Sequence, residues 1–496
     1  MNMGRENTKY GDFTPIIHGD FLSMKNVWTV NILIAGIWWR GHEGSDLTDS
    51  IMLASLNGEE KRITLLSIPR DLYVSYPEGK GAGRINSLYE IGKADKVWVK
   101  YLADKVSELT GQPIDHYIVI DFSGFKKIVD ILGGVEIDIP EELIDTEYPD
   151  ENYGYETLHI KKWLQVMDGE SALKYARSRH STSDFDRSIR QQLLIKALKE
   201  RIFAAGTITN PAALSRIFSA ITEHLDSDLS LANMAETAFA YRSIGTNNIQ
   251  VFSLNNECGS LRGCKSGSYL YNPSRDLFWW ASVLLPENAR SNKLSYYDDI
   301  RRFVDVSFRF PDLSGAERSL VIVSTRANMK KAQSIGIGLA KLGINVSREY
   351  STIISTGTIT QSHINIYWHP DLNIGINPES AVIKALKHIE ESIPYVIVAR
   401  NEYINDDGPR IEIVLWDDMN SYFSFVTPSY YLPTTPTSVT SGEVRSISGE
   451  LHSWTGKQKV VPTKKVKIPN STTASPGVTS VLSNTIQPGE WEHFGN

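Results

Sequence analysis

The chain has 496 residues, of which 41% are hydrophobic and 22% are charged, the ordinary balance of a globular protein. Its length favours two or three domains over a single one. The net charge of −7 argues against a protein that binds nucleic acid through its overall field.

Strands and helices alternate through the first 140 residues, which predicts an α/β fold with helices on both faces of a sheet. Apolar runs bounded by glycine, proline or polar residues predict strands at 29–37, 50–56, 63–68, 116–121 and 135–139. Helical spacing predicts helices at 97–109, 122–131, 188–203, 211–225 and 231–244. Gly111 is the expected C-cap of the first of these helices. A further strand is predicted at 251–254.

The stretch DGESALKYARSRHSTSDFDRSIRQQLL, residues 168–194, has the most readable local chemistry. Asp168 is the expected N-cap of one helix, and Ser183 or Asp184 is the expected cap of a second one. Arg187, Arg190 and Gln191 are three and four residues apart, so they share one face near the start of the second helix.

Arg177 and Arg179 end the first of these two helices and lie beside the same polar break. Guanidinium groups that converge on a helix start predict a site for an anion with several oxygens, most simply a phosphate or pyrophosphate. The alternative is that these arginines lie on solvated faces and pair with local carboxylates such as Asp184 and Asp186. The density of arginine without interleaved lysine favours bidentate recognition.

A second module is predicted after residue 316, where SLVIVSTRANMKKAQSIGIGLAKLGINV reads as a strand, a helix and a glycine stop. The predicted divisions are an N-terminal segment 1–28, a first domain 29–290, a linker 291–315, a smaller α/β domain 316–420 and a tail 421–496. The tail is rich in Ser, Thr and Pro, a composition that cannot bury much core, so a flexible segment is expected there.

The chain has two cysteines, Cys258 and Cys264. Their spacing suits a small disulfide loop, which would imply an oxidising compartment, but two free thiols remain open. No segment is long and apolar enough to span a membrane, and the first 20 residues carry no signal-peptide pattern.

Several motifs in a fixed order resemble the LytR-CpsA-Psr family. They are NILIAGIWWR at 31–40, LTDSIMLASL at 47–56, SIPRDLYV at 67–74, RINSLYEIG at 84–92, IDHYIVIDFSGFKKIVDILGGVEIDIP at 114–140, and KYARSRH with DFDRSIRQQ between 174 and 192. The resemblance implies an α-β-α layered catalytic domain with a mixed central sheet. The second module is similar to the small C-terminal domain often appended in this family.

The resemblance implies a phosphotransferase of cell-wall assembly. Such enzymes use Mg²⁺ to transfer a sugar phosphate of a glycopolymer from a polyprenyl-pyrophosphate carrier to a hydroxyl of peptidoglycan. It also implies a location at the membrane surface, on the extracytoplasmic face of the cell envelope. The family's usual N-terminal membrane helix is missing from this sequence, so either the anchor lies outside it or export works differently.

The resemblance also implies roles for individual residues. The expected pyrophosphate contacts are Arg70, Arg84, Arg177, Arg179, Arg187 and Gln191, with Arg190 on the same face. Asp49 matches a metal-binding aspartate, and Asp71 is expected to orient Arg70.

Two positions depart from the family pattern. Trp38 stands where the family has its first metal-binding aspartate, and Leu47 stands where it has a phosphate-binding arginine. Asp46, His42 or Glu43 could replace the missing metal ligand, because hard oxygen ligands suit Mg²⁺, or they could be ordinary loop residues. These departures keep a second reading open, a non-catalytic envelope protein that binds pyrophosphoryl lipid or wall polymer. A transcription regulator has little support, because no helix-turn-helix with a basic recognition helix is visible.

Overall fold

The computed structural model describes residues 29–38, 46–149, 154–178, 184–204, 216–217, 219–241, 244–245, 248–254, 269–290, 294–311, 313, 320–344, 346–352, 361–369, 374–375, 378–398 and 411–423. Within these ranges no helix combines the length and the apolar character needed to cross a membrane. The cysteine pair, residues 1–28 and the tail beyond 423 lie outside the described residues, so their predictions stay untested.

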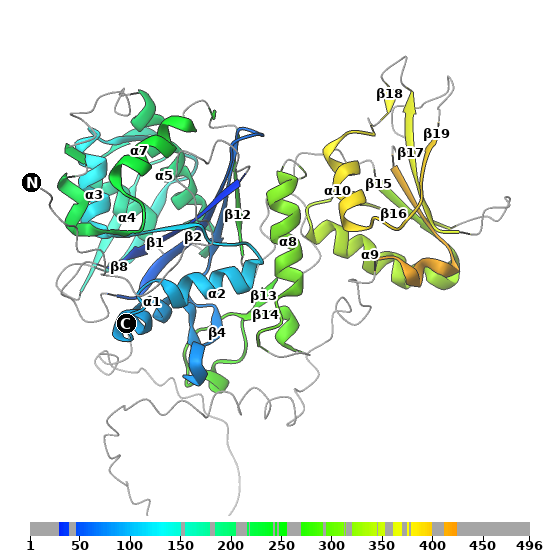
Figure 1. The fold of residues 1–496 in the computed structure, drawn as a ribbon, viewed down its shortest axis with the longest axis horizontal. Helices are drawn as coiled ribbons and strands as arrows, with labels where there is room; N and C mark the ends of the chain where they lie inside the picture. Colours follow the sequence, from blue (N-terminus) through cyan, green and yellow to red (C-terminus); the bar gives the residue numbers. More distant parts are fainter. Residues whose placement is uncertain are drawn as a thin grey trace, which may run out of the picture.

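The first unit is built on a six-stranded sheet in the order β11-β6-β1-β2-β3-β12 (Figure 1). Its strands are β1 (Thr29–Ile37), β2 (Thr48–Asn57), β3 (Arg62–Ile68), β6 (His116–Asp121), β11 (Leu225–Ser227) and β12 (Ile249–Ser253). β1 pairs with β2 in antiparallel and with β6 in parallel orientation. The predicted mixed central sheet is therefore confirmed.

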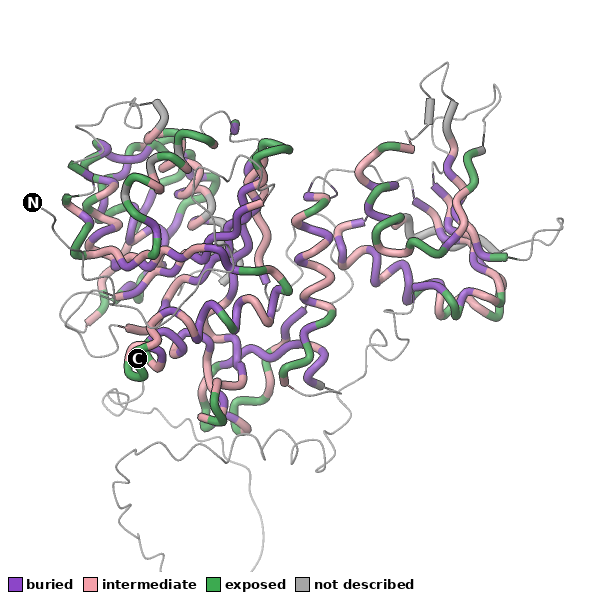
Figure 2. The backbone as a smooth tube through the Cα atoms, viewed as in Figure 1, coloured by how far each residue is buried: buried purple, intermediate pink, exposed green. Residues whose placement is uncertain are grey.

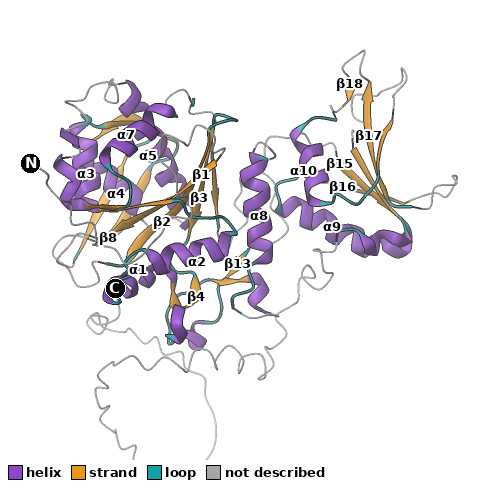
Figure 3. Cartoon of the chain, in the orientation of Figure 1, coloured by secondary structure: helices purple, strands orange, loops and turns teal. Residues whose placement is uncertain are grey.

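Side chains alternate along the strands, so each face of the sheet has its own apolar core. Leu33 and Ala35 of β1 face one core, together with Leu102 of α2. Val30 and Ile32 face the other core, against α5 and α7. The helices are α1 (Leu88–Ala94), α2 (Lys100–Thr110), α5 (Asp184–Ala204) and α7 (Leu231–Ala240). Figures 2 and 3 show mainly buried strands with helices on both sides, the predicted α-β-α layering.

Three helix ends follow the predicted capping chemistry or extend it. Gly111 adopts φ 71° at the end of α2, and its N–H donates to the carbonyl of Ser107. Asp168 accepts a hydrogen bond from Ser171 N at 2.8 Å and begins α4 (Gly169–Arg177). Asp121 caps α3 (Phe122–Ile131) in the same way. Each such cap contributes about 1 kcal/mol to helix stability.

A subsidiary layer packs α3, α4 and α5 against β7 to β10 around a separate apolar core. It contains β7 (Val135–Ile139), β8 (Leu143–Pro149), β9 (Tyr155–Ile160) and β10 (Trp163–Met167), with β10 paired to β7 and β9 to β8. Short elements complete the first unit: β4 (Tyr73–Ser75), η2 (Pro77–Gly79), β5 (Ala82–Arg84), η3 (Ile85–Ser87), η5 (Thr222–His224), β13 (Leu270–Tyr271), η7 (Arg275–Phe278), β14 (Leu285–Pro286) and η8 (Glu287–Arg290).

The second unit has a sheet in the order β16-β15-β20-β17-β18, with β19 also paired to β17. Its elements are β15 (Leu320–Ser324), η10 (Arg326–Asn328), α9 (Met329–Lys341), β16 (Val346–Thr352), β17 (His363–His369), β18 (Ile374–Gly375), α10 (Ala381–Ile389), β19 (Tyr395–Val398), β20 (Ile411–Leu415) and η11 (Asp417–Ser421). The strand–helix alternation predicted for this module is present.

Helix α8 (Asp298–Arg309) lies within the segment predicted to be a linker. Ile300 and Val304 are fully buried in the core of the first unit, while Val306 belongs to the core of the second. Phe303 packs against both cores. Figure 1 shows α8 standing between the two sheets, so this interval is a shared structural element.

Candidate functional site

The predicted site residues gather where the strands of the first sheet end. β1, β3 and β6 run in the same direction, so their carboxyl ends share one edge with the start of β2. Ile37, the last residue of β1, lies opposite Thr48 on one side and Asp121 on the other. The carboxyl edge of such a sheet is the usual place for ligands in α/β folds.

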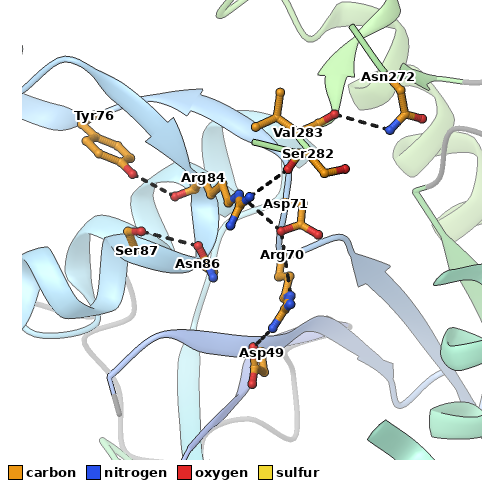
Figure 4. A network of polar contacts seen from close by, with 10 residues as sticks. All are labelled: Asp49, Arg70, Asp71, Tyr76, Arg84, Asn86, Ser87, Asn272, Ser282 and Val283. Carbon is orange, nitrogen blue, oxygen red and sulfur yellow. Dashed lines mark hydrogen bonds and ion pairs between the residues drawn. The ribbon is translucent and has the colours of Figure 1, made fainter. Parts of the chain in front are cut away.

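An ion-paired network occupies part of this edge (Figure 4). Arg70 follows β3 and donates through Nη1 to Oδ1 of Asp49, at the start of β2. Asp71 Oδ1 lies 3.9 Å from Arg70 Nε and 3.5 Å from Arg84 Nε. Arg84 also donates through Nη2 to the carbonyl of Ser282 at 3.1 Å. Two guanidinium groups from different elements are thus held beside two carboxylates.

The surrounding backbone fixes these arginines in place. Asn86 N donates to the carbonyl of Arg70 at 3.3 Å, and Thr48 Oγ1 donates to the carbonyl of Asn86 at 3.2 Å. Asn86 and Thr48 are buried. The Arg70 side chain keeps 27% of its surface exposed and that of Arg84 keeps 33%. Both guanidinium groups are therefore positioned by a rigid frame and still face solvent.

Arg177, at the end of α4, lies in an aromatic setting. Its guanidinium carbon is 4.1 Å from the ring centre of Trp38 and 4.9 Å from that of Phe122. Arg177 Nη1 donates to the hydroxyl of Tyr148 at 3.3 Å. Burial raises the pKa of Tyr148, although Arg177 and Lys174 act in the opposite direction. The phenol therefore stays neutral, and the charge of Arg177 is stabilised by rings without being cancelled.

Trp38 explains one departure from the family pattern. Its ring packs edge to face with Phe122 at 5.4 Å and lies beneath Arg177. The position where the resemblance implies a metal ligand thus carries an aromatic platform for an arginine. Because Trp38 follows β1 directly, it also lies beside the start of β2, where Asp49 pairs with Arg70.

The predicted cluster at the start of α5 has a partly different role. Arg190 is 6% exposed and donates through Nε to the carbonyl of Tyr175 at 2.9 Å and through Nη2 to that of Ser178. Gln191 Nε2 donates to the carbonyl of Ala176 at 3.4 Å. These two side chains therefore satisfy carbonyl groups at the end of α4. An anion contact by Arg190 or Gln191 stays a prediction.

The two remaining arginines of the predicted cluster are less informative. Arg187 is 8% exposed and lies one turn before Arg190 on the same side of α5, as predicted. Arg179 lies outside the described residues, as do His42 and Glu43.

A metal ion has few ligands here. Among the described residues, no group of three or more His, Cys, Asp or Glu side chains is arranged to hold one. Both carboxylate oxygens of Asp46 accept from Lys93 Nζ, at 2.6 and 2.7 Å. Asp49 is a hard oxygen ligand at the sheet edge, which suits Mg²⁺ held mainly by water and phosphate oxygens. The donor set fits such an ion through Asp49, whereas Asp46 would first have to release Lys93.

Sequence reasoning missed Tyr148 and Lys93 as parts of the site. Tyr148 lies on β8, where a register shift between Asp145 and Tyr148 breaks the alternation that normally reveals a strand. Asp145 is completely buried and accepts a hydrogen bond from Ser178 Oγ at 2.6 Å, which a hydrophobic pattern cannot anticipate. Lys93 is 47 residues from Asp46, and no sequence signal links the two.

Comparisons with known proteins give matches to one family and to several relatives. The model of the LytR_cpsA_psr family matches residues 6–278. The cell wall biosynthesis protein LcpA of Corynebacterium glutamicum is 31% identical over 209 residues, covering 37% of this chain and 38% of LcpA. The polyisoprenyl-teichoic acid–peptidoglycan teichoic acid transferase TagV of Bacillus subtilis is 28% identical over 220 residues, covering 43% of this chain and 53% of TagV. The chain thus spans about half the length of the curated relatives it matches.

Solved structures also align with part of this chain. The crystal structure of B. subtilis TagV aligns with 56% of this chain and 96% of its own, with a TM-score of 0.43 and 22% identity. The structure described as TagT bound to LI-WTA aligns with 58% of this chain and 93% of its own, with a TM-score of 0.42 and 20% identity.

Proposed function

The chain belongs to the LytR-CpsA-Psr family, and from that premise we propose that it transfers a glycopolymer from a polyprenyl-pyrophosphate carrier to a hydroxyl of peptidoglycan. We place this activity in the cell envelope, at the extracytoplasmic face of the membrane. The names of its relatives, a cell wall biosynthesis protein and teichoic acid transferases, support a role in wall assembly. The observation that carries the proposal is the set of positioned guanidinium groups at the carboxyl edge of the sheet.

In this proposal the arginines bind and orient the pyrophosphate. Arg70 and Arg84 present planar donor groups, which suit phosphate oxygens because two parallel N–H bonds fit one phosphate. Arg177 presents a third guanidinium, fixed against Trp38 and Phe122. Charge that develops on phosphate oxygens is stabilised when such donors are already in place.

We propose Asp49 as the protein ligand of a Mg²⁺ ion. When bound, this ion would supply further positive charge to the phosphate oxygens. Asp49 is paired with Arg70, so it would also hold that guanidinium beside the same phosphate group. Asp71 lies between Arg70 and Arg84 and would keep their spacing.

A second candidate is a non-catalytic protein that binds pyrophosphoryl lipid or wall polymer. Two observations favour this non-catalytic protein. Trp38 replaces a metal ligand of the family pattern, and Lys93 occupies both oxygens of Asp46. Both candidates need the arginines, but only the enzyme needs the metal.

One experiment separates the two candidates. The unaltered protein and Arg177→Ala are incubated with a short-chain polyprenyl pyrophosphate carrying a sugar and with soluble peptidoglycan as the acceptor, with and without Mg²⁺. Binding and release of polyprenyl phosphate are both measured. We expect Arg177→Ala to lose about 1.5–3 kcal/mol of binding, the value of a hydrogen bond to a charged group. Arg326→Ala, an exposed arginine of the second unit, is the control and should bind normally.

The outcomes are distinct. Release that depends on Mg²⁺ and weakens in Arg177→Ala supports the transferase. Binding without release under any divalent ion identifies the non-catalytic protein. Equal binding by the unaltered protein and Arg177→Ala refutes the assignment of this arginine.

A further inference from the structure

A pair of tryptophans projects into solvent beside the arginine network. Trp279 is 69% exposed and Trp280 is 78% exposed, among the most exposed large hydrophobic side chains of the described residues. They follow η7 directly, and Phe278 at the end of η7 packs in one apolar cluster with Tyr73 of β4 and Ala82 of β5. Neighbouring exposed aromatic groups of this size form an apolar patch, which is typical of a binding surface.

The backbone of this turn is strained at both tryptophans. Trp279 has φ 50° and Trp280 has φ 67°, the left-handed region that costs a residue other than glycine about 1–2 kcal/mol. Trp280 N donates to the carbonyl of Arg275 at 2.8 Å, and Ala281 N donates to that of Phe278 at 2.9 Å. The fold thus maintains an unfavourable conformation that points two rings outward, a pattern typical of functional sites.

The base of the turn is rigid. Phe278 is 2% exposed and packs edge to face on Tyr73, with ring centres 5.0 Å apart. Tyr73 in turn donates its N–H to the carbonyl of Leu284 at 2.8 Å. The two tryptophans therefore extend from the same packed layer of the structure as Arg70 and Arg84.

The turn lies close to the proposed pyrophosphate contacts. Ser282, two residues after Trp280, accepts the hydrogen bond from Arg84 Nη2 (Figure 4). Two extended residues span at most about 7 Å. The tryptophans therefore border the arginine network, within reach of a sugar chain attached to the pyrophosphate or of an acceptor chain.

The chemistry around the turn favours sugar over lipid. The C–H bonds of a pyranose ring carry partial positive charge, which suits the electron-rich face of an indole. Arg275 and Asp276 are exposed on η7 and offer hydrogen bonds to hydroxyl groups. Their charges cancel, whereas binding to an anionic bilayer normally relies on a cluster of basic side chains.

We propose that Trp279 and Trp280 form a stacking platform for pyranose rings of the carbohydrate chain that reacts at this site. The inference rests on the proposed function, because it assigns the sugar-binding part of the same site. The chain is either the glycopolymer of the donor or the glycan strand of the acceptor, which share this ring chemistry.

The test is carbohydrate binding without any pyrophosphate. Two probes are used, undecorated soluble peptidoglycan strands and wall glycopolymer released from its carrier. Trp279→Ala, Trp280→Ala and the double variant are compared by calorimetry with the unaltered protein. We expect binding of at least one probe to weaken about tenfold in the double variant, and Trp280→Phe to retain most of it, because a stacked aromatic pair contributes on that order. The probe that weakens identifies the source of the sugar.

Trp163→Ala is the matched control. Trp163 is 73% exposed and also has positive φ, but Lys162 Nζ already lies 5.6 Å from its ring centre, and it stands on β10, apart from the arginine network. Its removal should leave carbohydrate binding unchanged. The thermal midpoint of the Trp279 and Trp280 variants should also stay unchanged, because both side chains are exposed.

Three results overturn the inference. The first is no measurable binding of either probe by the unaltered protein, and the second is equal binding by the double variant. The third is that the double variant loses binding to phosphatidylglycerol vesicles but keeps its binding to carbohydrate, which identifies a bilayer as the partner. Neither probe contains a pyrophosphate, so this test can be interpreted even if the pyrophosphate assignment of the arginines fails.

Discussion

Asp299 links the stability of the protein to pH. It lies in the first turn of α8, facing Lys341 at the end of α9 and Arg302. Burial raises the pKa of Asp299 from its ordinary value of 3.8 to about 6, although Lys341 and Arg302 act in the opposite direction. The folded protein therefore holds a proton on Asp299 in a pH range where the unfolded chain has released it.

The sign of the effect follows from proton binding. Below about pH 4 both states are protonated and the contribution is complete, and it is lost as the pH rises to about 6, because the folded state must then ionise a buried carboxyl. A shift of about two pH units corresponds to at most about 3 kcal/mol of unfolding free energy. We expect Asp299→Asn to remove this dependence, since the amide oxygen can still accept from Ile300 N, now at 2.9 Å.

The assay is urea unfolding of the unaltered protein and Asp299→Asn at about pH 4 and about pH 7. The variant should gain up to about 3 kcal/mol relative to the unaltered protein between the two conditions. Asp298→Asn is the control, because Asp298 lies on the exposed side of the same turn and pairs with Arg301. Parallel pH profiles for the unaltered protein and Asp299→Asn would refute the reasoning.

Three further predictions concern other parts of the chain. Arg190→Met should lower the unfolding free energy by about 3 kcal/mol, because two buried carbonyl groups lose a charged donor, and chemical unfolding measures this loss. Asp49→Asn should abolish Mg²⁺-dependent release of polyprenyl phosphate. The thermal midpoint should change little, because a partly exposed ion pair contributes less than about 1 kcal/mol. Full retention of the metal dependence would exclude Asp49 as the ligand. Cys258 and Cys264 should form a disulfide in protein made under oxidising conditions, so intact mass without reduction should be two hydrogens below that of the dithiol, and alkylation of both thiols would contradict it.

Elements with regular periodicity were predictable from the sequence. The bounds predicted for 29–37, 116–121, 122–131 and 135–139 are those of β1, β6, α3 and β7. The caps at Gly111 and Asp168 were also predictable, because each depends on the chemistry of one side chain or its absence. Local rules suffice where one residue and its near neighbours decide the conformation.

Long-range pairing was not predictable in the same way. The strands β8 to β10 carry exposed apolar residues and a buried Asp145, so their pattern does not alternate cleanly. Arg190 was expected to contact an anion, but its nearest acceptors are carbonyls of α4, which sequence spacing alone cannot reveal. Helix α8 falls within the predicted linker; half of the residues in its sequence, DDIRRFVDVSFR, are charged, but its apolar residues pack in two cores.

Arg70 and Arg84 share a carboxylate before any substrate arrives. Asp71 lies between their Nε atoms, and Asp49 holds the far end of Arg70. An incoming anion must therefore compete with built-in counter-ions for the same donors. A monoanion such as acetate would only exchange one carboxylate for another, whereas a polyvalent ligand brings more charge and more acceptor oxygens than either aspartate. The arrangement lowers the affinity for every anion, and it lowers the affinity for monovalent anions most. The site therefore discriminates between anions by their valence.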